Sequence, residues 1–315
     1  MMSRRSLLQL GLVMASGAAK AANADAEGPL ETGRFRAIAD GVYVRLGRVA
    51  LISQGNLGAI ANLGFVVGKD AVAMIDSGGS MEDGRAALAA IRAVTSLPVR
   101  YLVNTHMHPD HIFGNEVFRQ AGAEIIAHHA LPAALAARRE TYLTTMRDEL
   151  GARLTAEVTI ALPDSTVDGE RLLDLGGRQL RLTAWGTAHT DNDLTVLDET
   201  SGTLFAGDLV FLDHVPIVDG SLKGWIAQLD ALAALPAERV VPGHGPVAAS
   251  WPQALQPGRR YLETLAGDIR LAIAEGRTLS EAIATAGASE AGNWALFDDY
   301  NARNASAAFA ELEWE

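Results

Sequence analysis

Short apolar runs and amphipathic stretches alternate along most of this 315-residue chain. Phe65–Val67 and Ala71–Ile75 flank a Gly-containing turn, so they predict a β-hairpin. Apolar residues then recur at helical spacing after Ser80, which predicts a helix beginning there with Asp83 in its first turn. Another apolar run, Val99–Asn104, predicts a buried strand. The first part of the chain is therefore expected to be rich in strands.

The same alternation continues through the rest of the chain. Glu124–Ala127 predicts a strand, and the Ala- and Leu-rich stretch Ala130–Leu150 predicts a helix. Three further strands, a helix and a last strand are predicted at residues 180–184, 194–198, 203–207, 222–232 and just before His244. Runs of strands followed by helices, repeated twice, predict an α/β fold of two sheets packed face to face with helices outside.

The end of the chain is helical in pattern. Apolar residues keep helical spacing from Leu262 to Ile273, and Thr278 with Glu281 has the pattern of a capping box that begins another helix. We therefore expect a main domain at residues 25–250 and a C-terminal helical extension at residues 251–315 that packs on the same domain.

Composition narrows the function. With 49% hydrophobic residues the chain can bury a large core, and its formal net charge of -12 argues against nucleic acid or an anionic membrane as partner. We expect a small-molecule substrate, and the sequence leaves the oligomeric state open. The absence of cysteine excludes disulfides, thiolate metal ligands and a cysteine nucleophile.

The densest chemical signal is the segment His106-Met107-His108-Pro109-Asp110-His111, which contains three of the eight histidines. It follows the predicted strand at 99–104, so a rigid sheet would hold its start. Imidazole and carboxylate are ligands that zinc accepts. The segment therefore predicts a metal site at the end of a strand.

Three further candidate ligands lie downstream, each close to a predicted strand. His189 follows the strand at 180–184, Asp208 ends the apolar run that begins at Thr203, and His244 lies in a Gly-rich turn after Val240 and Val241. The order of all these residues resembles the metal-binding motifs of the metallo-β-lactamase superfamily. That resemblance implies an αββα sandwich that holds two metals.

Transferred residue by residue, the resemblance assigns one zinc to His106, His108 and His189. It assigns the other zinc to Asp110, His111 and His244, with Asp208 bridging the pair. Paired metals about 3.5 to 4 Å apart can share a hydroxide and polarise a carbonyl, and a carboxylate between them offsets their repulsion. The best-known zinc β-lactamase subclasses use a cysteine in the second site, so the pattern here resembles glyoxalase II-like and lactonase-like hydrolases more closely.

Other residues have candidate roles around the metals. Asp76, after the strand at 71–75, is expected to hydrogen-bond a ligating imidazole and so tune catalysis from outside the ligand set; the competing explanation is a helix or turn cap before Gly78 and Gly79. His214 and Lys223 are candidate substrate contacts; for Lys223 an ordinary exposed lysine is the competing explanation.

The N-terminus resembles a twin-arginine export signal. Arg4 and Arg5 precede a moderately apolar stretch, Leu7–Ala19, which is shorter than the ~20 residues that span a bilayer. Residues 1–24 are therefore expected to be a cleaved signal peptide, with cleavage after Ala24 or, alternatively, after Ala21. This predicts a periplasmic protein without a membrane anchor; a disordered tail is the competing interpretation.

The tail sequences Phe297–Asn304 and Ala308–Glu313, with Asn62–Val67, resemble the quinoprotein relay system zinc metallohydrolases. This resemblance implies a functional link to periplasmic quinoproteins. The expected activity is zinc-dependent hydrolysis of an ester, lactone, thioester or amide by a metal-bound hydroxide, with Asp110 as ligand and proton carrier. Two alternatives are an iron-dependent redox enzyme of the same fold, similar to sulfur dioxygenases, and a non-catalytic periplasmic cofactor-binding or maturation protein.

Overall fold

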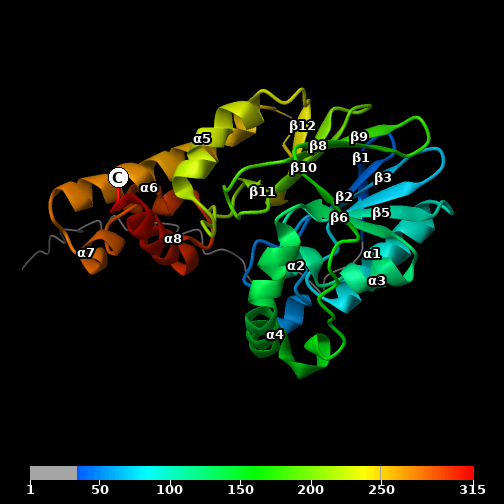
Figure 1. Cartoon of the computed structure of the whole chain (residues 1–315), viewed down its shortest axis with the longest axis horizontal. Coiled ribbons are helices and arrows are strands. Elements are labelled where there is room, and N and C mark those ends of the chain that lie inside the picture. The colour runs from blue at the N-terminus through cyan, green and yellow to red at the C-terminus, as the bar shows by residue number, and fades with distance from the viewer. Residues whose placement is uncertain (1–33, 249) are drawn as a thin grey trace, which may run out of the picture. The chain divides into compact units, whose positions relative to one another are not determined.

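The computed structural model describes residues 34–248 and 250–315, which form one compact unit. Two sheets pack face to face and helices cover both outer faces (Figure 1). The predicted α/β sandwich is thus confirmed. The predicted export segment, residues 1–24, and the predicted start of the main domain at residue 25 lie outside the described residues.

Seven described strands form the first sheet, in sequence order. The strands from β1 to β4 pair in antiparallel fashion, and those from β4 to β7 pair in parallel. The hairpin predicted around residue 68 is β3 with β4. The strands of this sheet are β1 (Arg36–Ala39), β2 (Val42–Arg45), β3 (Leu63–Val67), β4 (Val72–Ile75), β5 (Val99–Val103), β6 (Glu124–His128) and β7 (Ser165–Val167).

The second described sheet has the strand order β12-β11-β10-β9-β8. Its pairs are antiparallel except β11 with β12, which is parallel. Its strands are β8 (Glu170–Asp174), β9 (Gln179–Ala184), β10 (Leu194–Asp198), β11 (Thr203–Phe211) and β12 (Arg239–His244).

Strand β11 is longer than predicted. The apolar run was expected to end before Asp208, but the strand continues to Phe211, so Asp208 lies inside it. Gly207 has φ of 52°, a left-handed conformation that favours glycine, and the register with β12 shifts on both sides of it. A bulge therefore re-aims Asp208 without ending the strand.

Helices cover the two outer faces. The first sheet packs against α1 (Met81–Val94), α3 (Asn115–Gln120) and the ends of α4 (Leu131–Thr155), with the short α2 (Pro109–Ile112) at the end of β5. The second sheet packs against α5 (Leu222–Ala233), α6 (Gln256–Ala274) and α8 (Phe297–Leu312). Helix α7 (Leu279–Ile283) begins at the predicted capping box of Thr278 and Glu281. Short 3-10 turns lie at Gln54–Asn56, Gln253–Leu255 and Ala288–Asn293.

Three buried apolar clusters fill the spaces between the four layers. In β4, Val72 and Met74 face the helices, whereas Ala73 and Ile75 face the other sheet, because side chains alternate along a strand. Gly64 of β3 leaves room for the ring of Phe205 between the sheets, since a Cβ at Gly64 would lie 2.1 Å from that ring. This alternation explains why the predicted strands read as continuous apolar runs.

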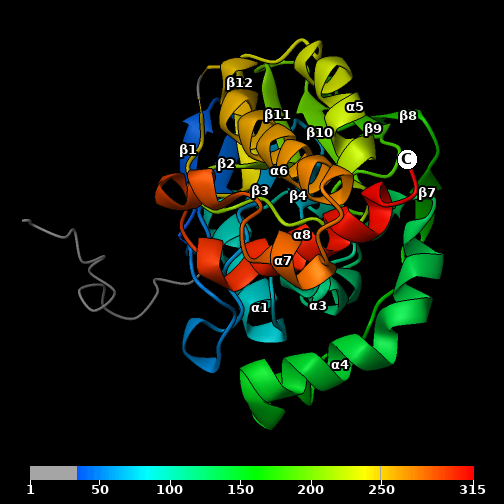
Figure 2. The same ribbon diagram turned by 90° about the vertical axis from the view of Figure 1, so that its left-hand side faces the viewer.

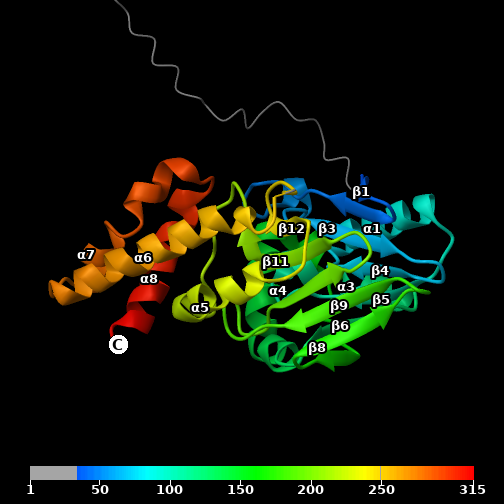
Figure 3. The same ribbon diagram turned by 90° about the horizontal axis from the view of Figure 1, so that it is seen from above.

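Two helical regions extend the sandwich. Figure 3 shows α6, α7 and α8 gathered beside one end of the strands, as the predicted C-terminal helical extension requires. Helix α4 stands apart from the strands over its middle part (Figure 2), and it bends at Gly151, where φ is 78°. None of the helices in the part of the chain that the structure describes is both long and apolar enough to cross a membrane.

Candidate metal centre

The His-rich segment runs from the end of β5 into the first turn of α2. His106 lies three residues after the end of the strand, His108 is the residue before the helix, and Asp110 and His111 lie within it. Pro109 at the first helical position has a fixed φ that suits a helix start. The tight turn therefore brings the four side chains together, with His106 and His108 in one cluster of candidate ligands and Asp110 and His111 in a second.

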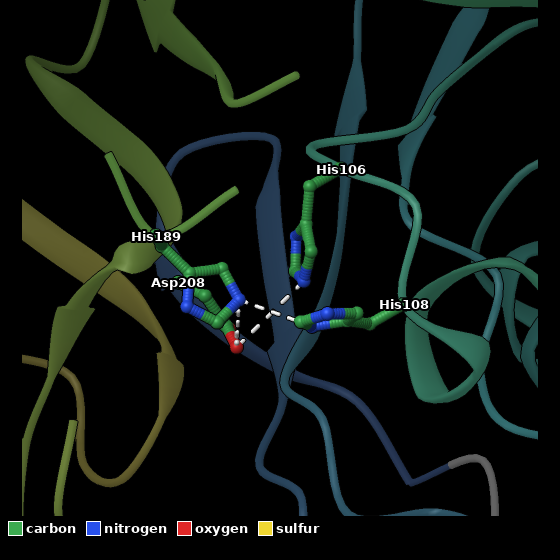
Figure 4. Close-up of side chains that lie close together, drawn as sticks. All are labelled: His106, His108, His189 and Asp208. Atoms are coloured by element: carbon green, nitrogen blue, oxygen red, sulfur yellow. Dashed lines mark hydrogen bonds and ion pairs between the residues drawn. The ribbon is translucent and has the colours of Figure 1, made fainter. Parts of the chain in front are cut away.

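Three imidazoles and one carboxylate form the first group (Figure 4). Nε2 of His106 and Nε2 of His189 lie 3.7 and 3.3 Å from Oδ2 of Asp208, and Nε2 of His189 lies 3.0 Å from Nδ1 of His108. One ligand atom from each of the four residues lies within 4.8 Å of all the others.

Asp110, His111 and His244 form the second group, with the same spacing limit. Oδ2 of Asp110 lies 3.5 Å from Nε2 of His111 and 3.3 Å from Nε2 of His244. His244 was predicted to lie in a turn after the last strand, but it is the final residue of β12 and is buried.

Asp208 joins the two groups. Its Oδ1 lies 3.3 Å from Nε2 of His111, and its Oδ2 lies 3.5 Å from Nε2 of His244 as well as close to the first group. Gly243 passes directly beside this carboxylate, since a Cβ there would lie 1.8 Å from Oδ1. A carboxylate in this position can contact a cation in either group.

The nitrogen of each ring that points away from the centre has a hydrogen-bond partner. Such contacts fix the tautomer and the plane of an imidazole. The partners are Thr105 Oγ1 for His106 (3.1 Å), Asp219 Oδ2 for His108 (3.0 Å), Asp76 Oδ2 for His111 (2.8 Å), the Ile217 carbonyl for His189 (2.7 Å) and the Ile60 carbonyl for His244 (3.1 Å).

The inward-facing atoms are in the opposite situation. Nε2 of His106, Nε2 of His111 and Oδ1 of Asp208 are buried and have no hydrogen-bond partner among the described residues. Buried polar atoms without a partner cost free energy, so each calls for an explanation. Nitrogen and carboxylate donors aimed at two common points fit two cations such as zinc.

The electrostatics of the first group favour the ligand forms. Burial lowers the pKa of His106 well below its usual range and that of His189 to about 4, so both rings stay neutral. Burial alone would raise the pKa of Asp208, but His244 and His111 hold it well below its usual range. In the second group, burial alone would likewise raise the pKa of Asp110, but the nearby rings of His111 and His244 lower it to about 2.

Asp76 lies where the first sheet meets this centre. Besides contacting His111, it accepts hydrogen bonds from the backbone N–H and the hydroxyl of Thr105, both at 2.8 Å. Its φ of 55° is left-handed, a conformation that Asp tolerates better than most residues. Asp76 thus holds the loop before His106 and also orients His111. It does not cap the following helix, because the N-cap of α1 is Ser80.

Asp219 and its loop were not predicted from the sequence. Residues 214–222 supply the partners of both His108 and His189, and α8 holds this loop in place. Asn304 accepts a hydrogen bond from the N–H of Val218 and donates one to the carbonyl of Pro216, and Arg303 donates to Asp219 at 2.6 Å. No sequence motif identifies these residues, because the histidines that they contact lie far away in the sequence.

The two candidate substrate contacts lie differently from the metal candidates. Nζ of Lys223 lies 3.2 Å from Glu315, and Lys223 does not line the cleft beside the metal groups. His214 is buried, with its ring between those of His244 and Tyr300 at centroid distances of 5.1 and 5.3 Å. The structure therefore does not bring either side chain to the cleft wall.

The chain matches the family model of the metallo-beta-lactamase superfamily over residues 58–244, well over half of its length. A metallo-beta-lactamase family protein from Thermus thermophilus is similar in structure, with a TM-score of 0.64 and 23% identity, covering 88% of this chain and 94% of that one. A metallo-beta-lactamase from Pontibacter korlensis gives a TM-score of 0.59 and 22% identity, covering 73% and 98%. The metallo-beta-lactamase FIM-1 from Pseudomonas aeruginosa gives a TM-score of 0.57 and 20% identity, and the match covers 73% of this chain and 94% of that one. At these identities the likeness establishes the fold.

Proposed function

Because the chain belongs to the metallo-beta-lactamase superfamily, we propose that it is a dinuclear zinc hydrolase that cleaves an acyl bond in an ester, lactone, thioester or amide. One observation carries the proposal: seven donor side chains converge on two adjacent points, while three of their buried atoms lack a partner among the described residues. A structural zinc site is usually closed by four ligands, whereas catalytic sites keep a position open.

The donor set fits two ions. One zinc would be held by His106, His108 and His189. The other would be held by the three residues of the second group, with Asp208 between the two ions. Bound zinc would supply a water whose pKa is lowered to about 7 and would polarise an acyl oxygen. The absence of cysteine means that the second ion would have only oxygen and nitrogen ligands from this chain.

The chain's own residues would then position the reaction. Asp208 places a negative charge between two cations and so lowers their repulsion. Asp110 lines the cleft as well as facing His244, so its ionised carboxylate can accept the proton released during attack on the acyl carbon. Asp76, Asp219 and the loop 214–222 keep the imidazoles in their orientation.

The test is hydrolysis by one preparation in three states: as purified, after chelation, and after reloading with zinc or with iron. Nitrophenyl esters, homoserine lactones, an acyl thioester and a β-lactam would be assayed. The proposal expects turnover that chelation abolishes and zinc restores. Oxygen uptake that only iron restores would favour the redox alternative, and no turnover with any substrate would favour the cofactor-binding alternative.

The location and partners of the enzyme are a further part of the proposal. Arg4 and Arg5 before an apolar stretch, and the tail Phe297–Asn304, support a periplasmic hydrolase that works beside quinone-dependent dehydrogenases. Replacing Arg4 and Arg5 with lysine should retain the protein in the cytoplasm, as fractionation would detect. Unchanged periplasmic location would refute the twin-arginine route.

A further inference from the structure

A cleft of about 510 Å³ lies beside the metal groups, with His108 and Asp110 in its wall. Helix α4 lines one side of it, and Tyr300 and Arg303 of α8 line another. Neither helix carries a candidate metal ligand. Their side chains in the cleft wall are therefore free to contact a substrate. Its walls therefore indicate what kind of acyl compound fits.

Two arginines line the cleft, and they differ in their contacts. Arg303 donates to Oδ1 of Asp219 at 2.6 Å, and Asp219 also contacts His108. Arg138, on α4, makes no hydrogen bond or ion pair with the residues that the structure describes. A half-buried guanidinium without a partner beside a cleft is available to an anion from solution.

The carboxylates in the wall do not neutralise Arg138. Asp110 faces His111 and His244, and Asp219 faces His108 and Arg303. Glu149 also lines the cleft, but it lies eleven residues further along α4, which corresponds to roughly 16 Å at 1.5 Å per residue. None of these three carboxylates pairs with Arg138, so its guanidinium is an unpaired positive charge in the cleft wall among the described residues.

Tyr142 adds a hydrogen-bond donor next to Arg138. The two residues are four apart on α4, so they lie on the same face of the helix. The hydroxyl oxygen of Tyr142 is buried and has no hydrogen-bond partner among the described residues. Burial raises the pKa of Tyr142, so its O–H remains a donor. A guanidinium and a phenol side by side match the two oxygens of a carboxylate.

The rest of the wall is mostly apolar. Leu51, Ile52 and Ile60 come from the loop before β3, and Met146 and Ile217 face the same space. Apolar walls bind the hydrocarbon part of a ligand by removing it from water. The cleft wall therefore combines an unpaired cation, an apolar surface and two members of the metal groups, His108 and Asp110.

We propose that Arg138 and Tyr142 bind the carboxylate of an acyl substrate whose hydrocarbon body lies along the apolar wall and whose scissile bond reaches Asp110 and His108. This inference rests on the proposed hydrolase function. It narrows the substrate class to carboxylate-bearing acyl compounds, and it assigns substrate selection to α4 and not to Lys223.

The test compares two esters of equal chain length on the zinc-loaded enzyme: the mono-p-nitrophenyl ester of adipic acid, which carries a free carboxylate, and p-nitrophenyl hexanoate, which does not. The wild type should prefer the charged ester by at least about tenfold in kcat/KM. Arg138→Gln should reduce that preference by about tenfold through a higher KM for the charged ester, Tyr142→Phe should reduce it less, and Arg138→Lys should restore part of it.

Arg139→Gln is the matched control, because Arg139 is the exposed neighbour on the same helix and does not line the cleft. It removes the same charge from the protein, so it corrects for long-range electrostatics. Equal preferences in Arg138→Gln and Arg139→Gln, or no preference in the wild type, would overturn the inference.

A binding measurement separates this inference from the proposed function. Zinc-loaded protein would be titrated calorimetrically with monomethyl adipate and with dimethyl adipate, which lacks the carboxylate. Tighter binding of the monoester that depends on Arg138 but not on Arg139 supports the subsite, even if neither nitrophenyl ester is hydrolysed. Equal binding of both compounds would contradict it independently of any turnover.

Discussion

Oδ2 of Asp219 lies 3.0 Å from Nε2 of His108, although 111 positions separate the two residues in the sequence. The contact leaves Nδ1 of His108 facing His189 and the centre of the first group. His108 is the one ring of the cluster that uses Nδ1 toward the centre, so its orientation depends on an acceptor behind Nε2. Asp219 is in turn held by Arg303 of α8, so the C-terminal extension reaches the metal groups through this carboxylate.

Asp219→Asn should weaken zinc binding by about 10- to 100-fold, because the neutral amide is a poorer acceptor for the N–H of His108. The fold should persist, since Asp219 lies in a loop outside the apolar clusters. Competition with a chromogenic chelator measures the affinity, and circular dichroism checks the fold. A variant that competes as well as the wild type would show that this hydrogen bond does not matter for the metal.

Asp76→Ala should also weaken zinc affinity by about 10- to 100-fold while the site survives. It removes the acceptor for Nδ1 of His111 and two hydrogen bonds to Thr105. Zinc competition and thermal melting on the same samples separate the two effects. Unchanged affinity with a lower melting temperature would mean that Asp76 only supports the loop.

Gly243→Ala should displace Asp208, because the added methyl group would lie 1.8 Å from Oδ1 of the carboxylate. We expect loss of at least one bound metal and of most turnover, measured by elemental analysis and kinetics. Gly267→Ala in α6 is the control: a Cβ there meets nothing within 4 Å, so that variant should bind metal normally. Full metal content in Gly243→Ala would contradict the placement of Asp208 between the two groups.

The two groups should differ in proton release when zinc binds to metal-free protein at pH 7. Burial alone would lower the pKa of His244, but Asp208 and Asp110 raise it to about 9, so this ring is charged at pH 7 and must lose its proton to bind metal. In the first group burial lowers the pKa of His189 to about 4, so that ring is already neutral.

Zinc affinity at the second group should therefore rise with pH up to about 9, because His244 must lose a proton there, whereas His189 in the first group has no proton to lose at pH 7. Calorimetry in two buffers of different ionisation enthalpy gives the protons released for each equivalent of zinc. Equal release for the two equivalents would contradict this difference in pKa between His244 and His189.

Local sequence patterns predicted most of the elements but not all of them. Strong apolar runs such as Val99–Val103 and Val72–Ile75 were identified, because burial on both faces demands them. The edge hairpin of β1 and β2 was not, since its strands have four residues each and none of the residues of β1 is buried. The continuation of β11 past Asp208 was missed because a glycine bulge has no apolar signature.

The candidate ligands were visible in the sequence because four of them lie within six residues and the others lie close to predicted strands. Their supporting partners were not, since Asp219, Ile217 and Ile60 are chosen by tertiary position and not by spacing. The same limit explains why the sequence pointed to Lys223 and not Arg138: only the placement of α4 brings Arg138 to the cleft.

The central claim is that Asp208 joins two metal sites, and the number of zinc ions per chain tests it most directly. Zinc-supplemented, desalted protein should contain two equivalents by mass spectrometry of the metals, and Asp208→Ala should keep at most one, bound by His106, His108 and His189. Asp168→Ala, which removes an exposed carboxylate, should keep two. One equivalent in the wild type, or two in Asp208→Ala, would contradict the account.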